Sequence, residues 1–315
     1  MDKIYSLVMG MPVARAGTLV FCILLFSSVI VRFGSRLAPQ VDWQELKLRV
    51  RSWWFMAFFF FLAVTLSRSI TIIFFALTSF WVLKEYVTIL DTRRADHRAL
   101  FWAFLVIPIQ YYWVATNWYI MFLIFIPVYA FLFIPLRLVL VQETAGFLSS
   151  VAKIQWGLMA FVFGFSHMAY LSTMPSIAGT SAGGSTLLLF LVIVTEMNDV
   201  FQFLWGKLIG RHKIFPIVSP KKTMEGFWGG VLTTTVASLA LRFLTPFGVV
   251  ETMFFAFCIA IAGFFGDVVM SAVKRDAGVK DFSNAIPGHG GALDRVDSLC
   301  YTAPLFFHMT AYFYY

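Results

Sequence analysis

Ten strongly apolar runs follow one another along this chain, and they limit its fold more than any other feature. A helix needs roughly 20 mostly apolar residues to span a bilayer. With 60% hydrophobic and 13% charged residues, the chain is far more hydrophobic than a soluble domain, which is about 45–50% apolar and 25% charged. We therefore predict an all-α, polytopic integral membrane protein with about ten transmembrane helices. The runs lie near 17–31, 52–67, 70–83, 99–114, 119–136, 154–173, 185–205, 227–245, 252–270 and 299–315.

The basic residues are distributed unevenly between the two sets of connecting segments. Of the 24 Lys and Arg, 20 lie in segments 32–51, 84–98, 137–153, 206–226 and 271–298. Cytoplasmic segments of membrane proteins carry such an excess. We therefore expect these five segments to be cytoplasmic in a multi-pass protein of the cell (inner) membrane, with the N-terminus outside. The net charge of +8 then reflects topology, and no nucleic-acid partner is expected.

The chain divides into two zones by where its unusual polar residues lie. Residues 1–173 form an N-terminal zone of transmembrane helices with few charges inside the runs. Within it, residues 42–51 place Trp43, Leu46 and Val50 on one helical face, which favours a helix lying at the membrane interface. Residues 174–315 form a C-terminal zone with nearly all of the unusual polar residues, so we expect the functional site there.

The seventh run carries polar side chains at bilayer depth: Glu196, Asn198, Asp199 and Gln202. A buried carboxylate costs about 2.5–3.5 kcal/mol even on a lenient insertion scale. Glu196 and Asp199 are three residues apart and share a helical face, so they repel each other unless a cation or basic group joins them. Asn198 and Gln202 have an alternative explanation as hydrogen-bonding links between helices. Asp199 is therefore the strongest functional candidate in this run.

Two cytoplasmic stretches supply the rest of a polar site. The basic loop 206–226 can meet phosphate through lysines such as Lys213 and Lys221. Residues 271–298 mix four basic residues with four aspartates and are formally neutral; Asp267 precedes them by a turn, on the same face as Ser271. Glycines at 288–291 permit close backbone approach, and their N–H groups can cradle phosphate.

Acidic groups for a metal, basic groups for phosphate and glycines for access together indicate phosphoryl or nucleotidyl transfer. Carboxylate oxygens with room left for water and phosphate suit Mg²⁺. The alternative explanation, a set of surface charge pairs, is weaker because such pairs add little stability.

Residues 271–298 resemble the signature of the phosphatidate cytidylyltransferases, also called CDP-diacylglycerol synthases. The residues that carry the resemblance are Ser271, Lys274-Arg275, Lys280-Asp281, Pro287, His289-Gly290-Gly291, Asp294-Arg295 and Asp297, with Asn198-Asp199, Gly206, Gly210, Lys213 and "SPKKTMEG" (219–226) upstream. It covers roughly 185–315, and its spacing is highly specific. Two departures suggest a divergent branch: Ala292 stands where the family has a bulkier apolar residue, and "DVFQF" (199–203) replaces the commoner continuation after Asn-Asp.

The resemblance implies that CTP and phosphatidate, or a related lipid phosphate, give CDP-diacylglycerol and pyrophosphate in phospholipid biosynthesis. It implies Mg²⁺, with room for a second cation, and a homodimer is a further arrangement open to the chain. The implied catalytic residues are Asp267, Asp294, Lys280, Ser271 and His289; the implied metal ligands are Asp267, Asp294 and Asp297; and the implied substrate-binding residues are Asn198, Asp199, Lys213, Lys221, Lys274, Arg275, Gly290, Gly291 and Arg295.

Two other functions fit parts of the pattern. A CTP-dependent lipid kinase of the polyprenol type would use the same groups but transfer the γ-phosphate. A cation-coupled transporter would bind its ion at the intramembrane carboxylates, but such proteins show broken helices in two symmetric halves. Here the polar residues are confined to one half.

Overall fold

The computed structural model describes residues 2–37, 40, 42–93, 96–177, 179–180, 182–288 and 290–315, with side chains from residue 12 onward. These residues are helical almost throughout. In chain order the elements are α1 (Asp2–Leu37), α2 (Gln44–Leu66), α3 (Arg68–Ile89), α4 (Asp96–Ala115), α5 (Tyr119–Ile124), the π-helix η1 (Phe125–Ala130), α6 (Phe131–Val139), α7 (Phe147–Gly157), the π-helix η2 (Leu158–Phe163), α8 (Gly164–Thr173), α9 (Gly184–Ile209), β1 (Lys213–Phe215), β2 (Ser219–Thr223), α10 (Met224–Ala237), the 3₁₀-helix η3 (Ser238–Leu244), α11 (Val249–Asp276), α12 (Leu293–Val296) and α13 (Leu299–Tyr314).

Nine helical segments within the described ranges are long and apolar enough to cross a membrane. The prediction of an all-α polytopic membrane protein is therefore confirmed. The tenth predicted run forms α13, whose 16 residues extend only about 24 Å at 1.5 Å per residue. This is shorter than the roughly 30 Å hydrocarbon core, and α13 packs between α11 and α8.

The structure differs from the predicted elements in two places. Residues 213–223 form an antiparallel hairpin in which Lys213 pairs with Thr223 and Phe215 with Ser219, where the sequence indicated only a basic loop. Residues from Gln44 onward continue without a break into α2, so the interfacial segment predicted at 42–51 is not a separate helix. No Gly or Pro separates residues 44–51 from the span that follows, so the sequence holds no signal that would end the helix between them.

Close packing of α9 against α10 fixes the position of the site's main helix. A Cβ on Gly230 would lie 2.3 Å from Gln202 Cγ, and one on Gly226 would lie 2.9 Å from the Gln202 carbonyl oxygen. Small residues let neighbouring helices approach at backbone distance within a membrane. The α9 backbone is thereby held directly against α10.

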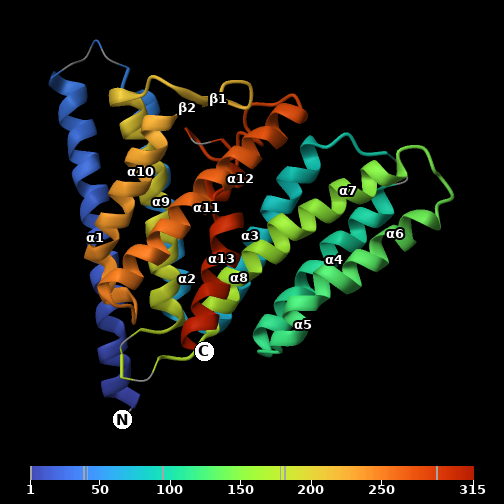
Figure 1. The fold of residues 1–315 in the computed structure, drawn as a ribbon, viewed down its shortest axis with the longest axis horizontal. Coiled ribbons are helices and arrows are strands. Elements are labelled where there is room, and N and C mark those ends of the chain that lie inside the picture. Colours follow the sequence, from blue (N-terminus) through green and yellow to red (C-terminus); the bar gives the residue numbers. More distant parts are fainter. Residues whose placement is uncertain are drawn as a thin grey trace.

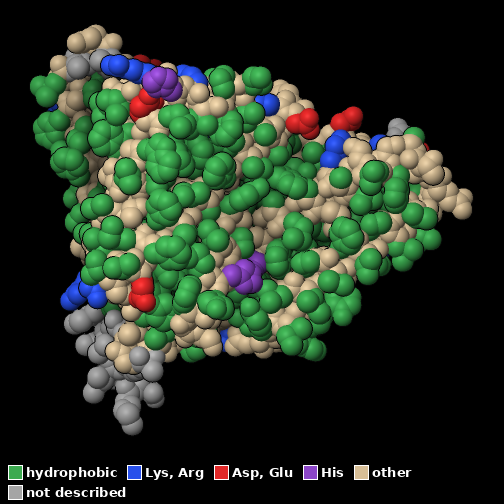
Figure 2. All heavy atoms as spheres, in the orientation of Figure 1, with side chains coloured by type: hydrophobic (Ala, Val, Ile, Leu, Met, Phe, Trp, Pro, Cys, Tyr) green, Lys and Arg blue, Asp and Glu red, His purple; other side chains and the backbone are tan. Residues whose placement is uncertain are grey.

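The polar elements gather at one end of the molecule. In Figure 1 the hairpin and α12 lie at the top, whereas the C-terminus and the start of α1 lie at the bottom. We call the end of the molecule that carries the hairpin and α12 the hairpin end. Figure 2 shows hydrophobic side chains over most of this face, with Lys, Arg, Asp and Glu along the edge at the hairpin end and a few at the opposite side. A hydrophobic surface with charged residues at its ends is expected of a protein that spans a bilayer.

Candidate active site

Polar side chains from four segments meet at the hairpin end. They come from the C-terminal half of α9, from β2, from the C-terminal half of α11 and from residues 282–298 around α12. Two lysine–carboxylate pairs link these segments, one through Lys222 and one through Lys274. Acidic residues singled out by the sequence thus lie beside the predicted Lys274 and beside a second lysine, Lys222, across nearly 100 residues of chain.

The first pair joins the hairpin to α11. Lys222 places Nζ 2.6 Å from Asp267 Oδ2 and 4.5 Å from the centre of the Phe264 ring. Ser271 donates from Oγ to Asp267 Oδ1 over 3.3 Å, which confirms that these two residues share a helical face. The sequence singled out Lys221, which is exposed. Successive strand residues point to opposite faces, so within β2 only one of the two lysines reaches α11.

The second pair closes the stretch that follows α11. Lys274 places Nζ 2.9 Å from Asp294 Oδ1 and 3.9 Å from Asp297 Oδ2. Asp294 Oδ2 also accepts hydrogen bonds from the backbone N–H groups of Phe282 and Gly291, each at 2.9 Å. Both oxygens of the buried Asp294 carboxylate are therefore occupied by its own chain. In this structure Asp294 organises the 282–294 loop.

Other carboxylates lie close by with less complete pairing. Ser298 donates from Oγ to Asp199 Oδ2 over 3.0 Å. Asp199 Oδ1 is buried and has no hydrogen-bond partner among the described residues. Burial and the neighbouring Asp267 carboxylate raise the pKa of Asp297 well above its ordinary range. Asp199 and Asp297 therefore lack the full set of partners that Asp294 has.

The carboxylate oxygens of this cluster are the type of ligand that a divalent cation binds. Hard carboxylate oxygens suit Mg²⁺, which binds through one or two carboxylates and completes its shell with water and phosphate. The unpartnered Asp199 Oδ1 offers one such ligand. No group of three acidic, His or Cys side chains in the described part of the chain is arranged around a common metal position. Magnesium therefore stays a prediction that rests on a one- or two-carboxylate site.

Asn198 forms hydrogen bonds between helices, which was the alternative explanation for this residue in the sequence analysis. Its side chain is fully buried; Nδ2 donates to the Ala260 carbonyl over 3.0 Å, and Oδ1 accepts from Thr234 Oγ1 over 3.5 Å. These bonds join α9 to α11 and α10. Asn198 therefore fixes the depth and rotation of α9, the helix that presents Asp199.

The remaining predicted residues surround this cluster. Lys213, Arg275 and Lys280 are exposed, as phosphate-binding side chains at an entrance can be. Arg295 is half-buried, and its Nε has no partner among the described residues. Gly290 has a φ of +83°, and a Cβ there would lie 2.9 Å from Asp294 Oδ2, so its glycine identity is required. The predicted catalytic His289 lies outside the described residues.

Sequence reasoning missed two helices of the N-terminal zone that hold the loop. Glu85, on α3, is buried and accepts three hydrogen bonds from residues 283–293. Ser52, on α2, donates from Oγ to the Pro287 carbonyl over 2.9 Å. A Cβ on Gly288 would lie 2.9 Å from Leu48 Cβ. The only sequence signal was an acidic residue at the end of the third apolar run.

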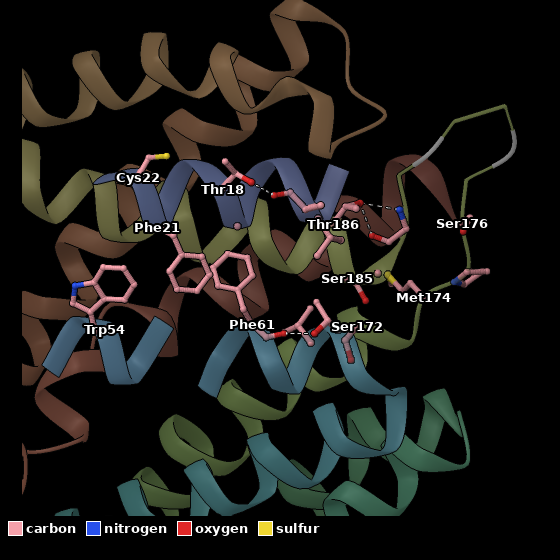
Figure 3. Close-up of a pocket in the computed structure, with 18 of the residues that line it drawn as sticks. Thr18, Phe21, Cys22, Trp54, Phe61, Ser172, Met174, Ser176, Ser185 and Thr186 are labelled. Atoms are coloured by element: carbon pink, nitrogen blue, oxygen red, sulfur yellow. Dashed lines mark hydrogen bonds between the residues drawn. The ribbon is translucent and has the colours of Figure 1, made fainter. Parts of the chain in front are cut away.

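A cavity of about 940 Å³ lies elsewhere, between α1, α2, the end of α8 and the start of α9. Figure 3 shows Phe21, Trp54 and Phe61 along its apolar wall and Ser172, Ser185 and Thr186 at one end. None of the described residues that line it is charged or belongs to the predicted site. Phosphate chemistry needs charged groups, so the candidate active site is the polar cluster and not this cavity.

Residues 47–313 match the model of the cytidylyltransferase family. The likeness therefore reaches further toward the N-terminus than the expected 185–315. YnbB, an uncharacterized protein of Escherichia coli (strain K12), is 44% identical over 293 residues, which are 93% of this chain and 96% of that protein.

Phosphatidate cytidylyltransferases are also among the similar proteins. The one from Staphylococcus saprophyticus is 33% identical over 158 residues, 49% of this chain and 61% of that protein. The one from Staphylococcus aureus (strain COL) is 36% identical over 128 residues, 40% of this chain and 49% of that protein. This chain thus spans less than two thirds of either enzyme.

Proposed function

Because this membrane-spanning chain belongs to the cytidylyltransferase family, we propose that it transfers CMP from CTP to phosphatidate, giving CDP-diacylglycerol and pyrophosphate. Relatives over part of the chain bear the name phosphatidate cytidylyltransferase. The observation that carries the proposal is the pair of lysine–carboxylate contacts at the hairpin end, Lys222 with Asp267 and Lys274 with Asp294. They put phosphate-binding cations beside carboxylates at the end of a bundle of apolar helices.

The reaction needs positioning and charge neutralisation more than covalent help from the protein. An oxygen of the lipid phosphate attacks the α-phosphorus of CTP, a new P–O bond forms, and the bond to the bridging oxygen of pyrophosphate breaks. Lys222, Lys274 and Arg295 would hold the phosphates of the two substrates. Each ammonium carries three N–H donors, so either lysine can bind a phosphate while it keeps its carboxylate partner.

The carboxylates would then divide two tasks. Asp267 and Asp199 would hold a magnesium ion, which when bound would neutralise charge on the phosphates of CTP. Ser271 fixes the Asp267 carboxylate through its hydroxyl, and Ser298 does the same for Asp199. Asp294 would keep the 282–294 loop closed and hold Lys274 beside Asp297.

The proposed orientation follows from the charge distribution of the sequence. If the basic segments are cytoplasmic, the hairpin end faces the cytoplasm of the cell that makes the protein. CTP would then arrive from the cytoplasm, and the lipid phosphate would lie at the inner leaflet of the inner membrane. Both substrates would reach the same polar cluster from opposite directions.

The test uses the purified full chain with phosphatidate and CTP labelled at either the α or the γ phosphate. A cytidylyltransferase places the α label in the lipid fraction and the γ label in pyrophosphate. Asp267→Asn should lower the transfer of α label about a hundredfold, a loss typical of removing one transition-state stabiliser. Asp276→Asn, on the same helix but exposed, is the matched control. Transfer of γ label to lipid instead would indicate a kinase and overturn the proposal.

A further inference from the structure

Glu85 is a buried carboxylate that reaches the loop from the other half of the chain. It lies in the last turns of α3 and is 6% exposed. Its Oε1 accepts from Ser283 Oγ at 2.7 Å and from the Ala292 N–H at 3.0 Å, and its Oε2 accepts from the Leu293 N–H at 2.8 Å. All three donors belong to the stretch that carries the family signature.

Among the described residues, no basic side chain forms an ion pair with the Glu85 carboxylate. A buried charge is costly unless it is paired or hydrogen-bonded, so the loop supplies the compensation. The carboxylate and the loop therefore stabilise each other: if the loop moves away, the charge loses its partners, and if the charge is removed, two backbone N–H groups lose theirs.

Gly291 lies between Glu85 and Asp294. Its N–H donates to Asp294 Oδ2 over 2.9 Å, and a Cβ at this position would lie 2.5 Å from Glu85 Oε2. Two carboxylates from opposite halves of the chain thus hold the turn that leads into α12. That short helix carries Asp294 and Arg295 and is followed by Asp297, which are the groups that face Lys274 and the acidic cluster.

We propose that Glu85 is a positioning residue that holds the 282–293 loop and α12 in the geometry that the reaction uses. The inference rests on the proposed function, because it is through that loop that Glu85 acts on the reaction. It makes α3, in the N-terminal zone, part of the active site. Glu85 itself touches neither reacting group in this proposal; it sets where Asp294 and Arg295 lie.

The first experiment compares Glu85→Gln with Glu143→Gln, which changes an exposed acidic residue. Glutamine offers one acceptor oxygen and an NH₂ group, so at least one loop N–H would face a donor. We expect kcat for CMP transfer to fall about ten- to a hundredfold, as small misplacements can do. KM for CTP should change less than about threefold, because Lys222 lies on the hairpin and is not held by the loop. The control should match the wild type.

Hydrogen exchange at the amides of Ala292 and Leu293 gives a readout that does not depend on the reaction. In Glu85→Gln these amides should exchange about tenfold faster or more, because they lose bonds to a charged acceptor. If the wild type transfers no CMP but the exchange still changes, only the proposed function fails. If exchange and kcat both equal those of the wild type, or if kcat rises, the positioning role is wrong.

A second-site test guards against a variant that does not fold. Gly291→Ala should lower kcat strongly in the wild type because its Cβ meets the Glu85 carboxylate. In Glu85→Ala the same change should cost much less, since the remaining neighbour, Ser283 Oγ at 3.0 Å, is the end of a side chain that can turn. Equal losses in the two backgrounds would show that Gly291 does not respond to Glu85 and would refute the contact. Glu85→Asp, which keeps the charge but shortens the reach, serves if Glu85→Gln cannot be purified.

Discussion

Replacing Asp294 with asparagine tests whether its carboxylate closes the loop as the structure indicates. One oxygen faces the Lys274 ammonium, and the other accepts two backbone N–H groups. Asparagine has nearly the same shape but only one acceptor oxygen. If that oxygen faces the backbone, the NH₂ group faces the ammonium, and if it faces Lys274, the NH₂ group faces the two N–H donors. Either orientation puts donor against donor at a side chain that is 2% exposed.

The expected loss of stability follows from these contacts. Removing one partner of a buried ion pair costs about 3–5 kcal/mol, because the other charge is left uncompensated. We take the lower limit, about 3 kcal/mol, since Asp297 Oδ2 remains 3.9 Å from the Lys274 ammonium. At roughly 2 °C per kcal/mol for a chain of this size, the unfolding midpoint should fall by about 6 °C.

Thermal unfolding of the purified protein in detergent measures this shift, and CMP transfer is assayed on the same samples at a temperature where both proteins are folded. We expect transfer to be lost, and added magnesium should not restore it, because Asp294 acts here through the loop. Asp276→Asn should melt like the wild type. An unchanged midpoint for Asp294→Asn would refute the buried-pair reasoning, and rescue by magnesium would return Asp294 to the metal site.

Three further results are expected. Lys222→Ala should lower CMP transfer about a hundredfold, as loss of one electrostatic stabiliser does, whereas Lys221→Ala should change it less than about threefold; purified variants and labelled CTP measure both. Asp199→Ala should lower turnover strongly and Gln202→Ala only mildly, as steady-state kinetics of the two variants can measure. The effect of Gln202→Ala should be mild because a helix–helix hydrogen bond in a membrane averages about 0.6 kcal/mol and Gln202 Nε2 has no partner among the described residues. A cysteine at Ile217, which is 90% exposed in the hairpin, should react with an impermeant maleimide only from the cytoplasmic side.

Each result has a contrary outcome. Equal effects of Lys221→Ala and Lys222→Ala on CMP transfer would mean that the direction in which each β2 side chain points does not decide its role. Small, equal effects of the two α9 changes would make Asp199 structural. For the labelling, Cys22, Cys258 and Cys300 are first replaced by alanine, and Val250→Cys, 79% exposed at the opposite end of α11, should react from the outside. Reversed labelling would overturn the orientation.

Local spacing predicted those parts of the site that lie on one element. Asp267 and Ser271 are four residues apart on α11 and do contact each other. The apolar runs likewise predicted the spans, because burial within a bilayer is a property of each segment by itself.

What the sequence could not show depends on contacts between distant elements. Glu85 meets its three donors across about 200 residues of chain, and a single acidic residue at the end of an apolar run carries no sign of such a partner. The choice between Lys221 and Lys222 depends on a five-residue strand whose facing is set by α11. Helical periodicity says nothing about either.

The order of synthesis gives the Glu85 contact a consequence in time. Glu85 leaves the ribosome 198 residues before Ser283 and 208 before Leu293, so at about 5–20 residues per second it waits roughly 10–40 s for its donors. During that interval water must hydrate its carboxylate, which requires the end of α3 to stay at the membrane surface. The candidate active site would therefore be assembled last, after most spans have inserted, and a chain cut short before residue 293 would be a membrane protein whose loop never closes.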